Sequence, residues 1–247
     1  MTYGVLTISL NSAGTIARTI DSVLSQTLTP AEYVFVDGGS TDGTVEIIRE
    51  KQREYVSDGG RIEFKLIDQG SERGITPAWN LGLAQMTADV IFILNSDDWY
   101  TPDCAWAVMS AMAADSRIEI VQASMATYRP GATTSVGVEN LRPAFMMPVL
   151  MAFVHPACFV RRGVYERLGN FDCRYRIAAD YEFLYRCLKG GVSISRLDKV
   201  LVNFQLGGCA NQSRREARLE MFHIARKYCR VPFLPHIVLL LRSILSR

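Results

Sequence analysis

Short apolar segments alternate with helix-forming segments over about the first 125 residues, and this alternation limits the fold more than any other feature. The segments that have the composition of buried strands are residues 3–10, 33–37, 62–68, 90–94 and 118–124. Helical patterns lie between them, and the one at 76–86 has Pro77 in its first turn, where proline is tolerated. Strands that alternate with helices form βαβ units in a parallel sheet. The sequence therefore predicts an α/β fold with a mostly parallel sheet flanked by helices.

The second half of the chain is less regular. Prolines at positions 130, 143 and 148 predict a long connection over residues 127–150. A helix is expected at 180–190, followed by strands near 192–197 and 200–204. With 247 residues, of which 49% are hydrophobic, the chain can bury a full-sized core in one large domain or two small ones.

Positive charge is concentrated at the C-terminal end. The net charge of the whole chain is only +2, which argues against a nucleic-acid partner. Residues 213–247 contain eight Lys or Arg and two Glu, a net charge of +6, so the rest of the chain carries −4. A basic segment on a near-neutral body indicates an anionic surface as partner, and a membrane is the first candidate. A basic amphipathic helix is predicted from about 213 to 228.

An apolar stretch follows at 233–247. It is shorter than the roughly 20 residues that span a bilayer. It predicts a helix that lies in a membrane interface through Ile237, Leu240, Leu241, Ile244 and Leu245. The alternative is a helix packed on the protein's own body.

The cysteines and the N-terminus indicate a cytoplasmic protein. The six cysteines include no CxxC pair, and no His/Cys group has zinc-ligand spacing. The N-terminus has a strand-like pattern instead of a charged region followed by a long apolar stretch, so no signal peptide is expected. Reduced thiols and a cytoplasmic location are predicted, with peripheral contact to the inner face of the plasma membrane through the tail.

Carboxylates follow three of the predicted strands. Asp37 follows the second strand, Asp68 the third, and the adjacent pair Asp97 and Asp98 the fourth. Ligands of open parallel sheets bind outside the carboxyl ends of the strands, so these side chains are expected along one edge. Hard divalent cations bind carboxylates together with substrate phosphates, which suits a metal held by the pair and a diphosphate. The alternative is a solvated turn, because Asp is common in turns.

The segment VDGGSTDGT after the second strand also has two interpretations. Its glycines allow tight turns, and Asp42 or Thr44 can cap the helix that follows. In the functional interpretation, the carboxylate of Asp37 accepts hydrogen bonds from a nucleobase or a ribose.

Several motifs follow one another in the order found in family 2 glycosyltransferases. They are TISLN, SVLSQT, VDGGSTDGT, ERGITPAWNLGLAQMTADVIFILNSDDWYTPD, HPACFVRRGVYERLGNFD and AADYEFLYRCLKGG. Each is weak alone, but the ordered set covers about residues 3–208 and resembles the bacterial enzymes that build surface polysaccharides. The resemblance implies a GT-A fold at 1–212, followed by the basic tail at 213–247. Within that fold, a nucleotide-sugar-binding α/β half (about 1–125) is fused to a smaller acceptor-binding and catalytic part (about 126–212).

The resemblance assigns the donor nucleotide to the first half. Ser9 and Asn11 would line the nucleotide pocket, and Asp37 would bind the base. Arg73 lies in the segment that positions the nucleotide. Asn80 is assigned to the same segment, although its residue type and place also fit a simple helix-surface amide.

Within NSDD, the resemblance assigns two roles. Asp97 matches a carboxylate near the ribose and the metal, and Asp98 matches the ligand of a divalent cofactor, Mn or Mg, that bridges to the donor diphosphate. The family often carries a basic or imidazole side chain in the loop after the last strand, which helps to hold the diphosphate. This sequence has Gln205 there, with Arg214 and Arg215 further on, so the donor contacts of the loop stay open.

The resemblance also implies an inverting displacement, which requires a base for the acceptor hydroxyl. Asp180 occupies the family's base position, where the preceding residue is often Glu but here is Ala179. A helix N-cap is the alternative for Asp180, and Glu182 is a second candidate base. His155 matches a position near the acceptor or the metal, although a lone His after an apolar stretch is also typical of a core.

These expectations combine in a metal-dependent, inverting glycosyltransferase of the hexosyltransferase type. It would move a sugar from a nucleotide-diphosphate sugar, with UDP as the expected carrier, to a saccharide or lipid-linked saccharide during cell-surface polysaccharide synthesis. A nucleotidyltransferase is one alternative, but LNSAGTIARTI is a poor match to a glycine-rich triphosphate loop. A nonenzymatic nucleotide-sugar-binding module is the other, and the presence of four aspartates at matching positions (Asp37, Asp97, Asp98 and Asp180) argues against it. No motif identifies the sugar, the acceptor or the oligomeric state.

Overall fold

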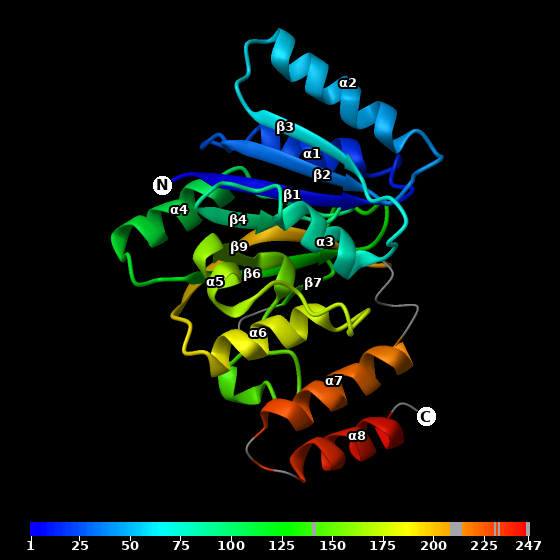
Figure 1. Cartoon of the computed structure of the whole chain (residues 1–247), viewed down its shortest axis with the longest axis vertical. Helices are drawn as coiled ribbons and strands as arrows, with labels where there is room; N and C mark the ends of the chain where they lie inside the picture. The colour runs from blue at the N-terminus through cyan, green and yellow to red at the C-terminus, as the bar shows by residue number, and fades with distance from the viewer. Residues whose placement is uncertain (140–141, 208–213, 230, 232, 246–247) are drawn as a thin grey trace.

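The computed structural model describes residues 1–139, 142–207, 214–229, 231 and 233–245, with the backbone alone at 214 and 240–245. Helices cover both faces of one sheet, and the last two helices, α7 (Arg214–Tyr228) and α8 (Leu234–Leu245), lie at the end of the molecule opposite α2 (Figure 1). Among the described residues, no helix combines the length and apolar character needed to cross a membrane.

The first four strands form the parallel part of the sheet, in the order β3-β2-β1-β4. The strands are β1 (Tyr3–Ser9), β2 (Glu32–Asp37), β3 (Glu63–Asp68) and β4 (Val90–Ile93). The helices between them are α1 (Ile16–Leu24), α2 (Thr44–Ser57) and α3 (Ile75–Leu83). Because helices cover both faces, β2 and β4 are buried along their whole length, which explains their continuous apolar runs.

The second half makes the sheet mixed. Its order continues β8-β6-β9-β5, and β8 lies antiparallel between β4 and β6. The strands are β5 (Trp99–Tyr100), β6 (Ile120–Tyr128), β7 (Gly137–Glu139), β8 (Cys158–Arg161) and β9 (Ile194–Gln205). The prediction that the strand at 118–124 continues the parallel sheet is therefore wrong in one respect. That strand is β6, and the antiparallel strand β8 separates it from β4. The two strands expected at 192–197 and 200–204 form the single strand β9.

Two apolar cores lie on opposite faces of the sheet. The remaining helices are α4 (Cys104–Ala114), α5 (Arg162–Leu168) and α6 (Ala179–Lys189), with short 3₁₀ turns η1 (Ala144–Met146) and η2 (His155–Ala157). One core lies under α1, α2 and α4, and the other lies under α3, α5 and α6. Ile224 of α7 belongs to the second core and is 0% exposed, and burial of such a side chain contributes about 1.5–3 kcal/mol. α7 therefore packs on the body through Ile224, while the predicted boundary at 212/213 lies outside the described residues.

The carboxyl ends of the parallel strands lie in one row. Ser9 pairs with Asp37, and Asp37 pairs with Asp68, across β1, β2 and β3. β4 lies on the other side of β1, so the following loop with Asp97 and Asp98 leaves from the same edge. The expected position of these carboxylates along one edge is confirmed.

Candidate active site

Asp37 organises the loop that follows β2. Its Oδ1 accepts hydrogen bonds from the hydroxyls of Ser9 (2.8 Å) and Ser40 (2.6 Å). Its Oδ2 accepts from the backbone N–H groups of Gly39 (2.9 Å) and Ser40 (2.7 Å). Four donors use the acceptor capacity of one carboxylate. A nucleobase would therefore reach Asp37 by sharing or replacing one of these donors.

Two other predicted donor-site residues contact the same loop. Asn11 has a φ of 50°, a left-handed conformation that Asn tolerates better than most residues. Its Oδ1 accepts from the N–H of Thr41 (2.9 Å), and its own N–H donates to the Ser40 hydroxyl (2.9 Å). The exposed guanidinium of Arg73 donates to the carbonyl of Gly38. The loops after β1 and β2 and the segment before α3 therefore meet around residues 38–41.

Further contacts join the loops after β1, β2 and β4. Asp42 accepts from the N–H of Ala13 (2.9 Å), and the N–H of Ser12 donates to the Thr44 hydroxyl (2.8 Å). The hydroxyls of Ser12 and Ser96 lie 2.7 Å apart. These contacts bring the loop that carries the acidic pair beside the loops after β1 and β2, as the sequence resemblance requires.

Asn80 contacts a different part of the molecule. Its Nδ2 donates to the carbonyl of Phe171 (2.8 Å), and its Oδ1 accepts from the N–H of the same residue (3.0 Å). The amide therefore fastens α3 to the segment before α6, and this geometry supports a structural role.

The two adjacent carboxylates have different environments. Asp98 is 0% exposed, its Oδ1 accepts from the N–H of Gln205 (3.0 Å), and its Oδ2 accepts from the Asn95 amide (3.1 Å). Asp97 is half-buried, and no donor from another described residue bonds to its carboxylate. Burial raises the pKa of both, that of Asp98 to about 8, and the charge of Asp97 adds to the second shift. Asp98 thus fastens the end of β9 to this loop, whereas Asp97 has a carboxylate available for a ligand.

Arg18 of α1 supplies positive charge beside this pair. Its Nη2 donates to the carbonyl of Asp97 (3.1 Å) and to Oε1 of Gln205 (2.8 Å). Its guanidinium lies 3.6 Å from the centroid of the Trp99 ring, within the range of a cation–π interaction. The sequence around NSDD does not predict this contact, because Arg18 lies 79 residues before Asp97. Gln205, at the position where the family often has a basic residue, instead connects Arg18 to Asp98.

The acidic pair could hold a divalent ion only together with oxygen ligands from another molecule. The described residues contain no group of three or more His, Cys, Asp or Glu side chains that could hold an ion by themselves. A divalent ion here would therefore need further oxygens, and donor phosphates commonly provide them. Both oxygens of Asp98 already accept hydrogen bonds, whereas those of Asp97 accept none from other described residues. Asp97 therefore has the more open carboxylate, and the metal role that the resemblance assigns to Asp98 stays a prediction.

Asp180 lies in the first turn of α6 and is half-buried. It is not the N-cap, which is Ala178, and its Oδ1 accepts from the N–H of Tyr181 (2.7 Å). Burial raises the pKa of Asp180 to about 6, and the charge of Glu220 on α7 also raises it, against the hydrogen bond from Tyr181. A carboxyl group with this pKa can accept a proton near neutral pH.

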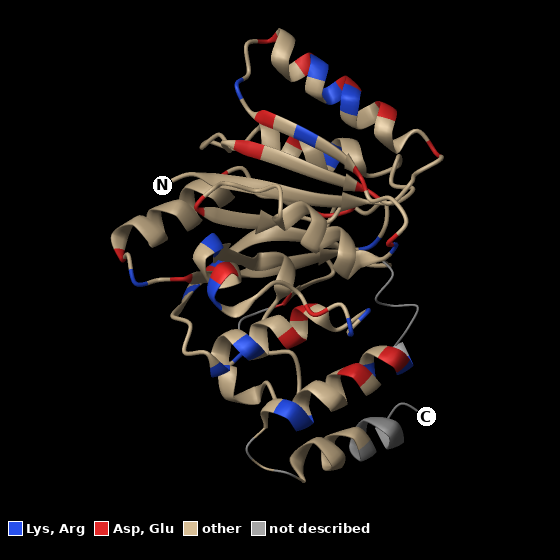
Figure 2. Cartoon of the chain, viewed as in Figure 1, with Lys and Arg blue, Asp and Glu red and all other residues tan. Residues whose placement is uncertain are grey.

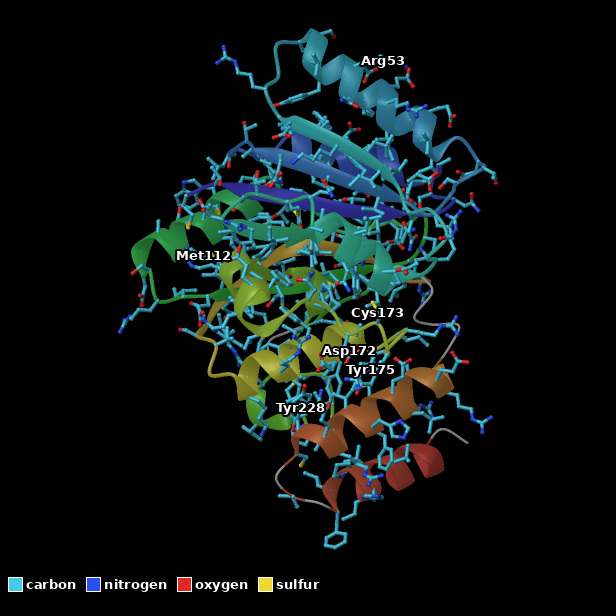
Figure 3. All side chains as sticks on the ribbon, viewed as in Figure 1. Arg53, Met112, Asp172, Cys173, Tyr175 and Tyr228 are labelled. Carbon is cyan, nitrogen blue, oxygen red and sulfur yellow. The ribbon has the colours of Figure 1, made fainter. Side chains whose placement is uncertain are left out.

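Glu182, the second candidate base, is occupied by other contacts. It is 1% exposed and accepts from Arg186 (2.9 Å), Lys227 (3.2 Å) and the hydroxyl of Tyr228 (2.5 Å). These donors lower its pKa against the effect of burial. Tyr228 lies where α7 meets α6 (Figure 3), so Glu182 holds the two helices together.

His155 lies in an apolar environment. Its ring centroid is 4.9 Å from that of Trp79 and 5.8 Å from that of Phe171. Burial lowers the pKa of His155 to about 4, so the ring is neutral at pH 7. These contacts support the interpretation of His155 as a core residue.

Comparison with known proteins agrees with this geometry. Residues 5–169 match the model of glycosyl transferase family 2. The chain is 26% identical over 212 residues to a PGL/p-HBAD biosynthesis glycosyltransferase of Mycobacterium bovis (strain BCG / Pasteur 1173P2), covering 85% of this chain and 79% of that relative. It is 27% identical over 193 residues to the uncharacterized glycosyltransferase Rv1514c of Mycobacterium tuberculosis (strain ATCC 25618 / H37Rv), covering 75% of this chain and 68% of that relative.

Solved structures share the fold. S. aureus TarS 1-349 in complex with UDP-GlcNAc has a TM-score of 0.71 at 18% identity, covering 97% of this chain and 70% of that one. A mannosyltransferase, PcManGT from Pyrobaculum calidifontis, in complex with GDP-Man and Mn²⁺, has a TM-score of 0.70 at 19% identity. The match covers 99% of this chain and 69% of that one. The chain spans only 42% of the TarS chain in another of its structures. The predicted GT-A fold is confirmed.

Proposed function

Because the chain belongs to glycosyltransferase family 2, we propose that it transfers a sugar, with inversion, from a nucleoside-diphosphate sugar to a saccharide or lipid-linked saccharide of a cell-surface glycan. The observation that carries this proposal is the arrangement of Ser9, Asp37 and the Asp97 loop along one sheet edge. Related proteins support the substrate class, since one is named for PGL/p-HBAD biosynthesis and two structural neighbours are in complex with UDP-GlcNAc or GDP-Man.

In the proposed mechanism, the loops after β1 and β2 bind the nucleoside, and Asp97 would hold a divalent Mn or Mg beside the diphosphate. When bound, such an ion neutralises the charge of the leaving nucleoside diphosphate. Arg18 offsets the negative charge of the acidic pair and, through Gln205, holds the end of β9 against it.

Asp180 is the proposed base. The acceptor oxygen attacks the anomeric carbon from the side opposite the diphosphate, its proton passes to a carboxylate oxygen of Asp180, and the bond from the sugar to the diphosphate breaks. Glu182 and His155 take no part in this scheme, since the first binds α7 and the second lies among aromatic rings.

Thermal unfolding with a set of nucleoside diphosphates, each with and without Mn, tests the donor site. We expect UDP with Mn to raise the melting temperature, because a ligand at 100 times its Kd stabilises the folded state by about 2.7 kcal/mol. UMP is the matched control, since it lacks the second phosphate that would share the metal with Asp97. No shift with any nucleotide would contradict the proposed site. Release of UDP from a UDP-sugar in the presence of acceptor then separates an enzyme from a nonenzymatic binding module.

The tail is a second site of proposed contact, with an anionic membrane surface. Phe233 is 75% exposed and Ile237 is 53% exposed, whereas Val238 and Leu239 line a small cavity with α7. Within residues 233–239, Val238 and Leu239 therefore face α7, whereas Phe233 and Ile237 are exposed. α7 carries both signs of charge (Figure 2). The side chains of the other predicted membrane-facing residues, at 240, 241, 244 and 245, lie outside the described residues.

Flotation with vesicles tests the membrane contact. The wild-type chain is expected to float with vesicles that contain anionic lipid, and the double variant Phe233→Ala/Ile237→Ala is expected to remain in the soluble fraction. Val56→Ala is the matched control, because Val56 is 54% exposed on α2 at the other end of the molecule. A wild-type chain that does not float would disprove the contact.

A further inference from the structure

Glu220 of α7 reaches the backbone immediately before Asp180. One oxygen, Oε1, accepts from the N–H of Arg176 (2.9 Å), and Oε2 accepts from those of Ile177 (3.0 Å) and Ala178 (2.8 Å). The N-cap residue of α6, Ala178, makes no side-chain cap, and a carboxylate from another helix binds the N–H groups that lead into α6. A negative charge at this place is also favoured by the helix dipole.

A reciprocal contact lies on the other side of Asp180. Glu182 of α6 accepts from Lys227 and Tyr228 of α7, so each helix provides one carboxylate to the other. The two contacts bracket Asp180 in the sequence, which restricts both the entry to α6 and its first turn. The sequence separations are 42 to 46 residues, so no local motif signals this arrangement.

We propose that Glu220 is a positioning residue for glycosyl transfer: by holding the backbone of residues 176–178, it sets the place of Asp180 relative to the acceptor hydroxyl. This inference rests on the proposed role of Asp180 as the base. Glu220 touches no reacting atom, and its effect passes through the three N–H groups that it binds. α7 is then part of the catalytic apparatus, although it lies in the segment that the sequence assigns to a basic tail.

Two substitutions of Glu220 separate positioning from simple packing. Glu220→Ala removes the acceptor of three N–H groups, whereas Glu220→Gln retains one carbonyl oxygen that can accept from two of them. A catalytic group displaced by about 1 Å can lose on the order of 100-fold in rate, so we expect kcat of the Ala variant to fall by about 10- to 100-fold. The Gln variant is expected to lie between Ala and wild type. The KM for the donor and the donor-dependent rise in melting temperature should not change. The proposed donor residues follow β1, β2 and β4, which Glu220 does not bind.

Glu216→Ala is the matched control, because Glu216 is an exposed acid on the same helix that binds no described residue. It is expected to keep the wild-type kcat. A wild-type kcat in Glu220→Ala, measured at a temperature where the variant is folded, would overturn the inference, as would a rise in donor KM that accounts for the whole loss of rate. If the Ala variant does not fold, a wild-type kcat in Glu220→Gln would overturn it equally.

The failure of this inference differs from the failure of the proposed function. Inactive Asp180→Asn together with fully active Glu220→Ala would remove the positioning role alone. Fully active Asp180→Asn would remove the proposed base, and the role of Glu220 with it.

Discussion

Replacement of Asp180 by Asn is expected to lower kcat for sugar transfer by roughly 10²- to 10⁴-fold, the range that general-base catalysis contributes. Asn has the same shape and still accepts from the N–H of Tyr181, but it cannot take the proton of the acceptor hydroxyl. Donor binding should be unchanged, because among the described residues no hydrogen bond joins the loops after β1 and β2 to α6. The measurement is the transfer rate at saturating donor, beside the donor-dependent thermal shift of the same variant. Asp198→Asn, an exposed carboxylate on β9, is the matched control and should retain the wild-type rate.

The pH dependence of Asp180 has opposite signs for activity and for stability. The pKa of Asp180 is raised to about 6 by burial and by Glu220, so activity should rise with pH through about 6 as the carboxylate forms. Because the pKa of Asp180 is higher in the folded than in the unfolded protein, the protonated carboxyl group stabilises the fold at low pH. This contribution is complete at a pH below the unfolded-state pKa, and it is lost as pH rises through about 6. The permanently neutral Asn variant should therefore gain stability relative to wild type as pH rises from about 4 to about 6, and the gain should be constant above that. A flat pH–rate profile across this window would contradict Asp180 as the base.

Removal of the Asp97 carboxylate is expected to have the second large effect. Asp97→Ala should lose the metal-dependent part of the thermal shift by UDP, and kcat/KM should fall by roughly 10³-fold, since a metal ion supplies several kcal/mol of transition-state stabilisation. The variant without ligand should melt no lower than wild type, because the substitution removes a partly desolvated charge without leaving a buried donor unpaired. Addition of EDTA to the wild-type enzyme should produce the same loss of activity.

Asp98→Ala is the matched comparison, and it should lower the free energy of unfolding. The N–H of Gln205 and the amide of Asn95 would lose their buried acceptor, and each such loss costs about 1–3 kcal/mol. Urea unfolding measures this effect. If Asp98→Ala instead loses the Mn-dependent shift at unchanged stability, while Asp97→Ala retains it, the metal ligand is Asp98, as the family resemblance implies.

The parallel half of the fold can be predicted because each of its elements is a local pattern. An apolar run defines each of the strands β1, β2 and β4, and their order places the aspartates at one edge. β8 is missed because it has only four residues between a 3₁₀ turn and a helix. β5 has only two, and its pairing with β9 joins residues about 100 positions apart.

The roles within the site depend on contacts that are distant in the sequence. Asp97 and Asp98 are adjacent residues of the same type. Their hydrogen bonding differs because β9 brings the N–H of Gln205 to Asp98 alone. Arg18 and Glu220 are missed for the same reason, since the groups they bind lie far along the chain. Asp180 can be predicted from the motif around it, whereas the support of its backbone cannot.

The contact between Glu220 and the entry to α6 has a consequence for where this protein can be shortened. The family model ends at residue 169, before Asp180, and the motifs that resemble the family end near residue 208. A version of the chain cut at residue 212 would contain every recognised motif but would lack Glu220, Lys227 and Tyr228. The strand ends with Ser9, Asp37 and Asp97 would be present, whereas the backbone before Asp180 would have three N–H groups without their acceptor. If Glu220 positions Asp180 as proposed, the family motifs of this chain form only part of its active site.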